Sequence, residues 1–168
     1  MLTFEEARKI AENKLNQIPK GGDIGELVIL DDAIVEKPYA WIFGYNSKLF
    51  IETGDMLNAL GGNSPLFISK INGLISTYRS GLSLEQMIAE YEEEHKLYNL
   101  TLTNNIYSNS QNLLDLKKVL GLSTKEITEF KKLNQLIIAT GSMTKLNAIQ
   151  TDLNANKIKT IVTLRNLE

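Results

Sequence analysis

The chain has 168 residues, of which 43% are hydrophobic and 23% are charged, and it contains no cysteine. This composition is typical of a folded globular protein, and it excludes an intrinsically disordered chain, a disulfide framework and any site built from thiolates. The apolar runs are too short to span a bilayer, and the N-terminus is acidic where a signal peptide would be basic. We therefore expect a cytoplasmic protein that is neither exported nor held in a membrane.

The net charge is only −2, but the two halves of the chain carry opposite charges. Residues 1–95 hold 15 acidic and 8 basic side chains, a net charge of −7, whereas residues 96–168 hold 5 acidic and 10 basic side chains, a net charge of +5. This asymmetry indicates two units with different surfaces. We predict two domains, residues 1–95 and 96–168, with a boundary at the polar segment 92–95.

The first domain is predicted to be α+β, with an N-terminal helix packed on an antiparallel sheet. Thr3 and Glu6 form a capping box, which satisfies free amides of the first helical turn. Apolar residues then recur at helical spacing as far as Ile18. Three strands are expected to follow, at residues 26–31, 38–45 and 48–52. A turn at residues 31–33 is expected after the first of them.

A hairpin and a closing helix complete this predicted domain. Residues 66–69 and 75–78 favour two strands, and Asn72 and Gly73 between them are typical of a tight type I′ turn. Residues 83–86 form a second capping box, which opens the closing helix.

Residues 96–168 are predicted to form a small βααβαβ domain. Strands are expected at residues 98–103, 135–140 and 160–164, with two helices after the first strand and one helix after the second. A connection through one helix predicts that the last two strands are parallel neighbours joined by a right-handed crossover.

No group of residues favours catalysis. His95 is the only histidine; Glu92 or Glu94 could orient it as a general base, but an exposed histidine on a charged helix end is more often inert. The acidic segment 31–36 does not follow the calcium-loop pattern, and the glycines of residues 54–62 do not form a phosphate-binding motif. We predict a protein that binds and is not an enzyme, with no metal or cofactor.

Four aromatic residues alternate along the second predicted strand and so share one face of it: Tyr39, Trp41, Phe43 and Tyr45. Rings in this arrangement usually hold a helix on a sheet, although tryptophan and tyrosine also anchor protein interfaces. We expect the four rings chiefly to fasten the first helix, with the outermost rings, Tyr39 and Tyr45, also available to a partner. Whether Trp41 lies in the core or in an interface stays open.

The basic residues of the second half are spread among its helices, without interleaved aromatic residues or an arginine cluster. This distribution is commoner on solvated surfaces than on nucleic-acid-binding faces, so nucleic acid is not favoured as a partner.

The segment ELVILDDAIVEKPYAWIFGYNSK, followed by ETGD, GGNSP and SLEQMIAEYE, resembles the YrhB-like immunity proteins, the family numbered thirty-five among immunity proteins of bacterial polymorphic toxin systems. The resemblance covers about residues 1–94, and the tryptophan characteristic of that family falls on Trp41. It implies a protein that binds a cognate toxin domain and neutralises it.

If the partner is a basic toxin, exposed carboxylates would attract it and aromatic rings would anchor it. The candidate residues for steering or anchoring are Asp31, Asp32, Glu36, Tyr39, Trp41, Glu52 and Asp55, with Asn63 as a further candidate.

The second half is similar to the C-terminal domain of the bacterial ribosomal stalk protein over residues 98–165. Residues 121–126 (GLSTKE) are similar to that family's Gly-Leu-x-Leu-Lys-Glu turn, with Thr124 in place of a leucine. Lys125 falls on a basic position that contacts translation factors there, whereas the next lysine of the pattern is Thr128 here. The resemblance implies an alternative function, a translation-factor adaptor. Chaperone-like client binding and a small enzyme remain further alternatives.

Overall fold

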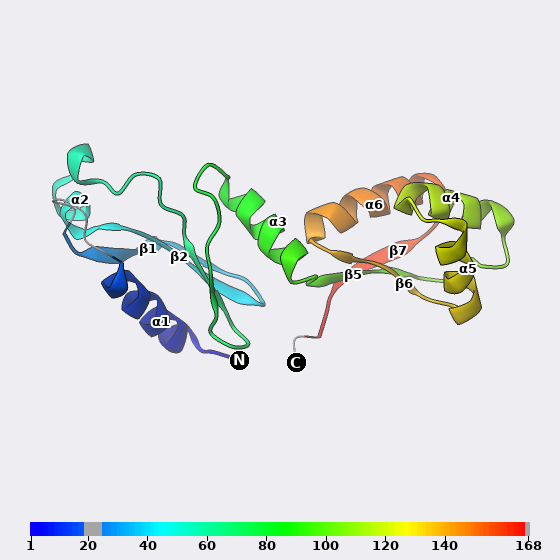
Figure 1. Ribbon diagram of the computed structural model, residues 1–168, viewed down its shortest axis with the longest axis horizontal. Coiled ribbons are helices and arrows are strands. Elements are labelled where there is room, and N and C mark those ends of the chain that lie inside the picture. The colour runs from blue at the N-terminus through cyan, green and yellow to red at the C-terminus, as the bar shows by residue number, and fades with distance from the viewer. Residues whose placement is uncertain (19–24, 167–168) are drawn as a thin grey trace. The chain divides into compact units, whose positions relative to one another are not determined.

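A computed structural model describes residues 1–18 and 25–166 (Figure 1). Contacts between residues divide the described chain into two compact units, residues 1–83 and 84–166. Both units are α+β, as predicted, and each has its own antiparallel sheet. The helix expected to close the first domain makes its contacts mainly within the second unit, so this division falls before that helix, whereas the sequence pattern favours a boundary after it.

In the first unit, the helix α1 (Phe4–Gln17) lies on one face of a four-stranded sheet (Figure 1). The capping box predicted for the helix is present, because the Thr3 hydroxyl accepts from the Glu6 amide and the Glu6 carboxylate accepts from the Thr3 amide. The strands of the sheet are β1 (Leu27–Glu36), β2 (Ala40–Ser47), β3 (Leu66–Ser69) and β4 (Ile75–Ser76). Each strand is hydrogen-bonded to the next one in this order.

The core of the first unit lies between α1 and the sheet. The buried face of α1 is made of small and aliphatic side chains, and it packs against alternate residues of β2 and β3: Ala7, Ala11 and Leu15 meet Phe43, Leu66 and Ile68. Trp41 and Tyr45 pack against the same cluster, half-buried. Three of the four alternating rings therefore fasten α1 to the sheet, as predicted, whereas the fourth, Tyr39, is buried but does not belong to this cluster.

Three local predictions in the first unit are wrong. Residues 48–52 form part of a helix, α2 (Lys48–Thr53), because the Ser47 hydroxyl caps its first turn and Gly54 ends it in the left-handed conformation. The predicted turn at residues 31–33 lies inside β1, and the chain reverses instead near Pro38, where the Lys37 amide donates to the Ala40 carbonyl.

The third correction concerns the hairpin of β3 and β4. The hairpin exists, but its turn is not type I′, because only Gly73, and not Asn72, adopts a positive φ. A wider loop closes it, in which the Gly73 amide donates to the Ser69 carbonyl and the Asn72 carboxamide oxygen accepts from the Leu74 amide.

The second unit begins with a helix and continues in the predicted βααβαβ order (Figure 1). Its core contains fully buried leucines from the central strand and from two helices, Leu100, Leu116, Leu146 and Leu153. The elements are α3 (Leu84–Glu94), β5 (Tyr98–Leu102), α4 (Ser110–Leu120), α5 (Thr124–Leu133), β6 (Ile137–Gly141), α6 (Met143–Ala155) and β7 (Thr160–Leu164).

The sheet of the second unit differs from the prediction in one respect. The last two strands, β6 and β7, are parallel to each other, but they are not neighbours, because β5 lies between them and pairs antiparallel with both. The central position suits β5, whose Tyr98, Leu100 and Leu102 are all buried. Helix α6 packs on all three strands, and α4 lies beside it. None of the helices in the described parts of the chain is both long and apolar enough to cross a membrane.

Truncating the buried ring of Phe43 tests the helix–sheet core. We expect Phe43→Ala to lower the free energy of unfolding by about 3–5 kcal/mol, because the variant loses buried area and leaves a cavity under α1. Urea unfolding followed by the fluorescence of Trp41, the only tryptophan, reports on this unit. The exposed control Leu133→Ala should change the value by less than about 0.5 kcal/mol. Equal stabilities of the two variants would contradict this core.

Candidate functional site

The acidic residues Asp31 and Asp32 lie on a bulge of the edge strand β1. Ile29 pairs with Tyr45 and Ile34 pairs with Phe43, so β1 holds several more residues than β2 between these two pairs. Among the additional residues, both aspartates are exposed. A methyl group at Gly44 would lie 2.7 Å from Cβ of Ala33, so the bulge can fold over β2 only because residue 44 is glycine.

Two of the predicted site carboxylates form ion pairs within the first unit. Asp31 accepts from Arg8 of α1 at 2.6 Å, and this bond, together with one from Arg8 to Glu12, raises the pKa of the arginine. Glu36 accepts from Lys70 at 2.6 Å. Both carboxylates stay largely exposed, so they can still act on a partner through their charge.

Trp41 lies in the helix–sheet packing. Its ring meets that of Phe4 edge to face with centroids 5.2 Å apart, and the ammonium group of Lys70 lies 4.2 Å from its ring centroid. Its indole Nε1 is buried without a hydrogen-bond partner among the described residues. Tyr39 is buried and Tyr45 is half-buried, so neither of these rings is displayed fully on the surface.

The segment from Ser47 to Asn63, which we call the α2–η2 loop, leaves the sheet at the end of β2. It contains α2 and a short 3₁₀ helix, η2 (Met56–Asn58). Polar side chains hold its two ends together. Asn46 accepts from the Leu60 amide at 2.7 Å, the Ser47 hydroxyl donates to the Asn58 carbonyl, and Asn63 donates to the Tyr45 carbonyl at 2.8 Å.

The α2–η2 loop displays the other two predicted carboxylates, Glu52 and Asp55, together with apolar side chains that no sequence prediction named. Asp55 caps η2 by accepting from the Leu57 amide at 2.9 Å. The exposed apolar residues are Leu49 (40% exposed), Ile51 (50%), Met56 (75%) and Leu57 (91%). Their signal in the sequence is weak: two adjacent hydrophobic residues, Met56 and Leu57, in a segment that glycine and asparagine mark as a loop.

The net charge of the first unit is smaller than that of residues 1–95. Residues 1–83 hold 10 acidic and 8 basic side chains, because five of the glutamates counted with the first half lie on α3. The first unit by itself is therefore only slightly acidic, and its negative surface consists of local groups such as the bulge and the α2–η2 loop.

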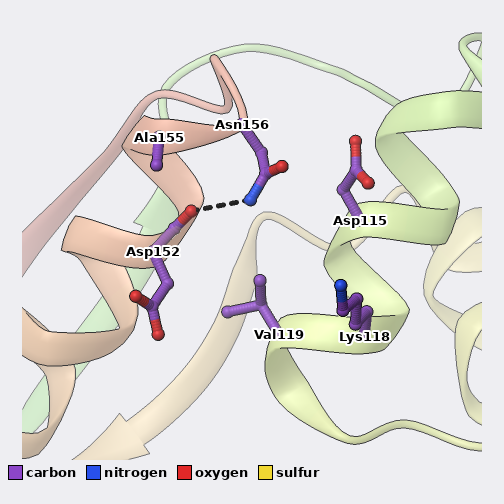
Figure 2. A pocket seen from close by; sticks show the side chains of 6 residues that line it. All are labelled: Asp115, Lys118, Val119, Asp152, Ala155 and Asn156. Carbon is purple, nitrogen blue, oxygen red and sulfur yellow. Dashed lines mark hydrogen bonds between the residues drawn. The ribbon is translucent and has the colours of Figure 1, made fainter.

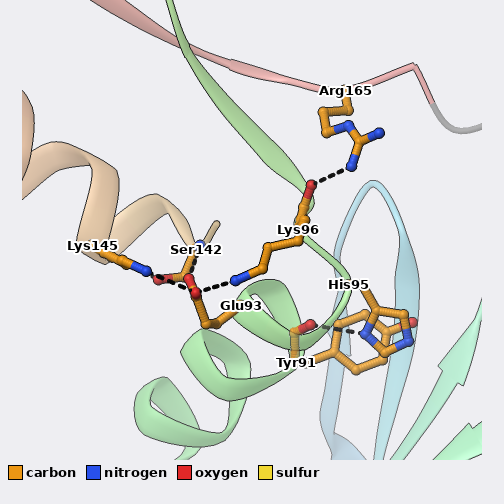
Figure 3. A network of polar contacts seen from close by, with 7 residues as sticks. All are labelled: Tyr91, Glu93, His95, Lys96, Ser142, Lys145 and Arg165. Carbon is orange, nitrogen blue, oxygen red and sulfur yellow. Dashed lines mark hydrogen bonds and ion pairs between the residues drawn. The ribbon is translucent and has the colours of Figure 1, made fainter. Parts of the chain in front are cut away.

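Glutamates of α3 cap the N-terminus of α6 within the second unit (Figure 3). The Glu93 carboxylate accepts from the Ser142 amide at 3.0 Å, from Lys145 at 2.8 Å and from Lys96, and the Glu92 carboxylate accepts from the Met143 amide at 2.9 Å. Negative charge is favourable at a helix N-terminus, because free amides and the helix dipole point toward it. Burial raises the pKa of Glu93, but the bonds from Lys145, Lys96 and Ser142 outweigh it and lower that pKa to about 2.

The exposed His95 sits beside this network and stacks on the ring of Tyr91 with centroids 4.2 Å apart (Figure 3). Its Nδ1 lies 2.9 Å from the Tyr91 carbonyl, to which it donates when protonated there. Across the described residues, no three histidine, aspartate or glutamate side chains are placed to hold a metal ion.

A shallow groove of about 390 Å³ lies between α4 and α6 (Figure 2). Asp115 accepts from Gln111 and Asn156 donates to the Asp152 carbonyl, so these bonds stay within one helix or its C-terminal cap. The groove offers carboxylates and one ammonium group on an open surface; its lining residues are Asp115, Lys118, Val119, Asp152, Ala155 and Asn156.

A family model described as immunity protein 35 matches residues 5–93, which are more than half of the chain. The chain belongs to this immunity protein family. It is also similar to the uncharacterized protein YrhB of Escherichia coli (strain K12), with 27% identity over 100 residues, which are 60% of this chain and 99% of YrhB. No solved structure matches the chain.

Membership of the family suggests an immunity protein of a toxin system, and such families are typically non-catalytic. The matched segment contains the whole first unit from Glu5 onward and nearly all of α3. The comparisons do not support the likeness of the second half to the ribosomal stalk domain. Lys125, the residue predicted from that likeness, is exposed on α5, in the second unit.

The capping of α6 by Glu93 predicts a stability that depends on pH. The folded-state pKa of about 2 lies below the ordinary value of 4.5, so the stabilisation is complete above about pH 5 and is lost as the pH falls toward 2. We expect the wild type to be more stable than Glu93→Gln at pH 6 and the difference to shrink steadily down to pH 2. Thermal unfolding followed by circular dichroism measures it; a difference that stays constant over this range would contradict the assignment.

Proposed function

We propose that this protein binds a cognate toxin domain and neutralises it by equilibrium docking, without making or breaking covalent bonds. The observation that carries the proposal is the match of the immunity protein 35 model to residues 5–93, a segment that includes the first unit. The cytoplasm of the cell that must resist the toxin is the expected place of action.

The surface of the first unit supports docking. The predicted site carboxylates are exposed on the β1 bulge, at the end of β1 and on the α2–η2 loop, and charges of this kind attract a basic protein and speed its encounter. Asp31, Asp32, Glu36, Glu52 and Asp55 would steer the toxin. Trp41 and Tyr39 would act indirectly, because their burial suits them to support the surface more than to touch a partner.

Co-expression tests the proposal directly. A candidate toxin is the C-terminal domain of a large secreted protein encoded beside the gene of this chain. Expressed alone in a bacterial host, that domain should stop growth, and co-expression of this chain should restore it. A folded chain that fails to restore growth would contradict the proposal for that toxin.

Reversing one charge on the bulge tests the steering role. Asp32 is exposed, and we expect Asp32→Lys to slow association with the toxin several-fold at low salt and little at 0.5 M salt, because salt screens exposed charges beyond a few ångströms. Stopped-flow fluorescence or surface plasmon resonance measures the association rate. The matched control, Glu129→Lys on α5, makes the same change of net charge in the second unit and should have a smaller effect. Equal rates for both variants would exclude the bulge from steering.

A further inference from the structure

The α2–η2 loop combines two properties that seldom occur together in a loop with no role. Its ends are fixed by the bonds of Asn46, Ser47 and Asn63 described above, and its turns are fixed by the capping of α2 and η2. The same loop holds four apolar side chains at 40–91% exposure. A loop whose conformation is set by polar bonds does not need these apolar side chains for its own stability.

The apolar residues are exposed in spite of a core close by in the sequence. Phe43, four residues before Ser47, is fully buried, and Leu66 and Ile68 after the loop are buried too. Leu57, in contrast, is the most exposed of the large hydrophobic residues in the described chain. Several exposed hydrophobic side chains on one short segment mark an interaction site more often than isolated ones do.

We propose that the α2–η2 loop is the part of this protein that docks on the toxin, with Met56 and Leu57 entering an apolar recess and Glu52 and Asp55 meeting basic side chains around it. This inference rests on the proposed function and adds the surface and the chemistry of the partner. A pre-organised loop loses little conformational freedom on binding, which favours tight association. Buried apolar anchors surrounded by polar contacts are the usual arrangement of a strong interface.

The charge of the α2–η2 loop indicates which kind of partner binds it. The loop has two carboxylates, Glu52 and Asp55, and a single basic residue, Lys48 at its start, which is paired with Glu26 at 3.2 Å. The loop surface is therefore both apolar and negative. It fits a basic protein, and it fits a second copy of itself poorly, because two such loops would bring carboxylates together.

The test uses the chain of 168 residues and the purified toxin domain that this chain neutralises in co-expression. We expect the double variant Met56→Ser, Leu57→Ser to raise the dissociation constant at least about ten-fold, as the loss of interface anchors does. The matched control Leu114→Ser, Leu133→Ser changes two leucines of the second unit that are 60% and 66% exposed, and it should bind within about two-fold of the wild type.

A second variant tests the same loop if the double variant does not fold. Glu52→Lys changes one exposed side chain near the end of α2, and we expect it to weaken binding several-fold at low salt and less at high salt. Circular dichroism and the unfolding midpoint establish that each variant is folded.

The outcomes separate the two proposals. If the wild-type chain neither rescues growth nor binds the toxin, both the proposed function and this inference are wrong. A wild-type chain that rescues and binds, together with folded loop variants that bind equally well, overturns the loop and leaves the proposed function standing. Sedimentation of the wild type as a dimer that the loop variants dissociate, with unchanged toxin binding, would assign the loop to self-association and overturn the inference.

Discussion

The burial of alternate residues of β2 beneath α1 is the interaction on which the first unit depends. Phe43 is completely buried in this layer, and Trp41 and Tyr45 pack beside it against the same helix. Because side chains of a strand alternate between its faces, fixing these rings fixes the register of β2 and hence the position of its last residues. Asn46 and Ser47 are those residues, and they hold the ends of the α2–η2 loop. The core thus places the loop that we propose as the docking surface.

Much of this arrangement could be predicted from the sequence, because it depends on local signals. The Thr3 capping box, the helical spacing in α1 and the alternation of aromatic residues each specify a local structure. The first two predictions are confirmed, and the third is confirmed for three of its four rings. The βααβαβ order of the second unit also follows from element lengths and periodicity. These signals act within a few residues of one another and need no knowledge of the rest of the chain.

The predictions that are wrong concern competition between local preference and tertiary structure. Asp31 and Asp32 favour a turn, but β1 accommodates them as a bulge because Gly44 across the strand leaves room for Ala33. The apolar run at residues 49–51 favours a strand, although the serine before α2 and the glycine after it act as helix caps. Which strands pair in the second sheet depends on what β5 must bury, and the spacing of elements does not contain that information.

The α2–η2 loop, too, could be predicted from the sequence only in part. The exposed carboxylates could be chosen from the sequence, because acidic residues in loops and turns are usually solvated. The exposure of Met56 and Leu57 could not, because hydrophobic residues in a loop are buried or exposed according to what packs over them. Helix α3 is a further case: nearly all of it lies within the segment that matches the immunity family, yet its Glu92 and Glu93 cap α6 of the second unit.

The central claim, that the protein acts by docking and not by catalysis, is tested most directly by the stoichiometry of neutralisation. Purified toxin at a concentration well above the dissociation constant is titrated with this chain while the toxin's remaining activity is measured. Docking predicts that activity falls linearly and ends when one chain is present for each toxin molecule, and that separating the two proteins restores it. Complete and lasting inactivation by a small fraction of an equivalent would show covalent turnover of the toxin and contradict the account.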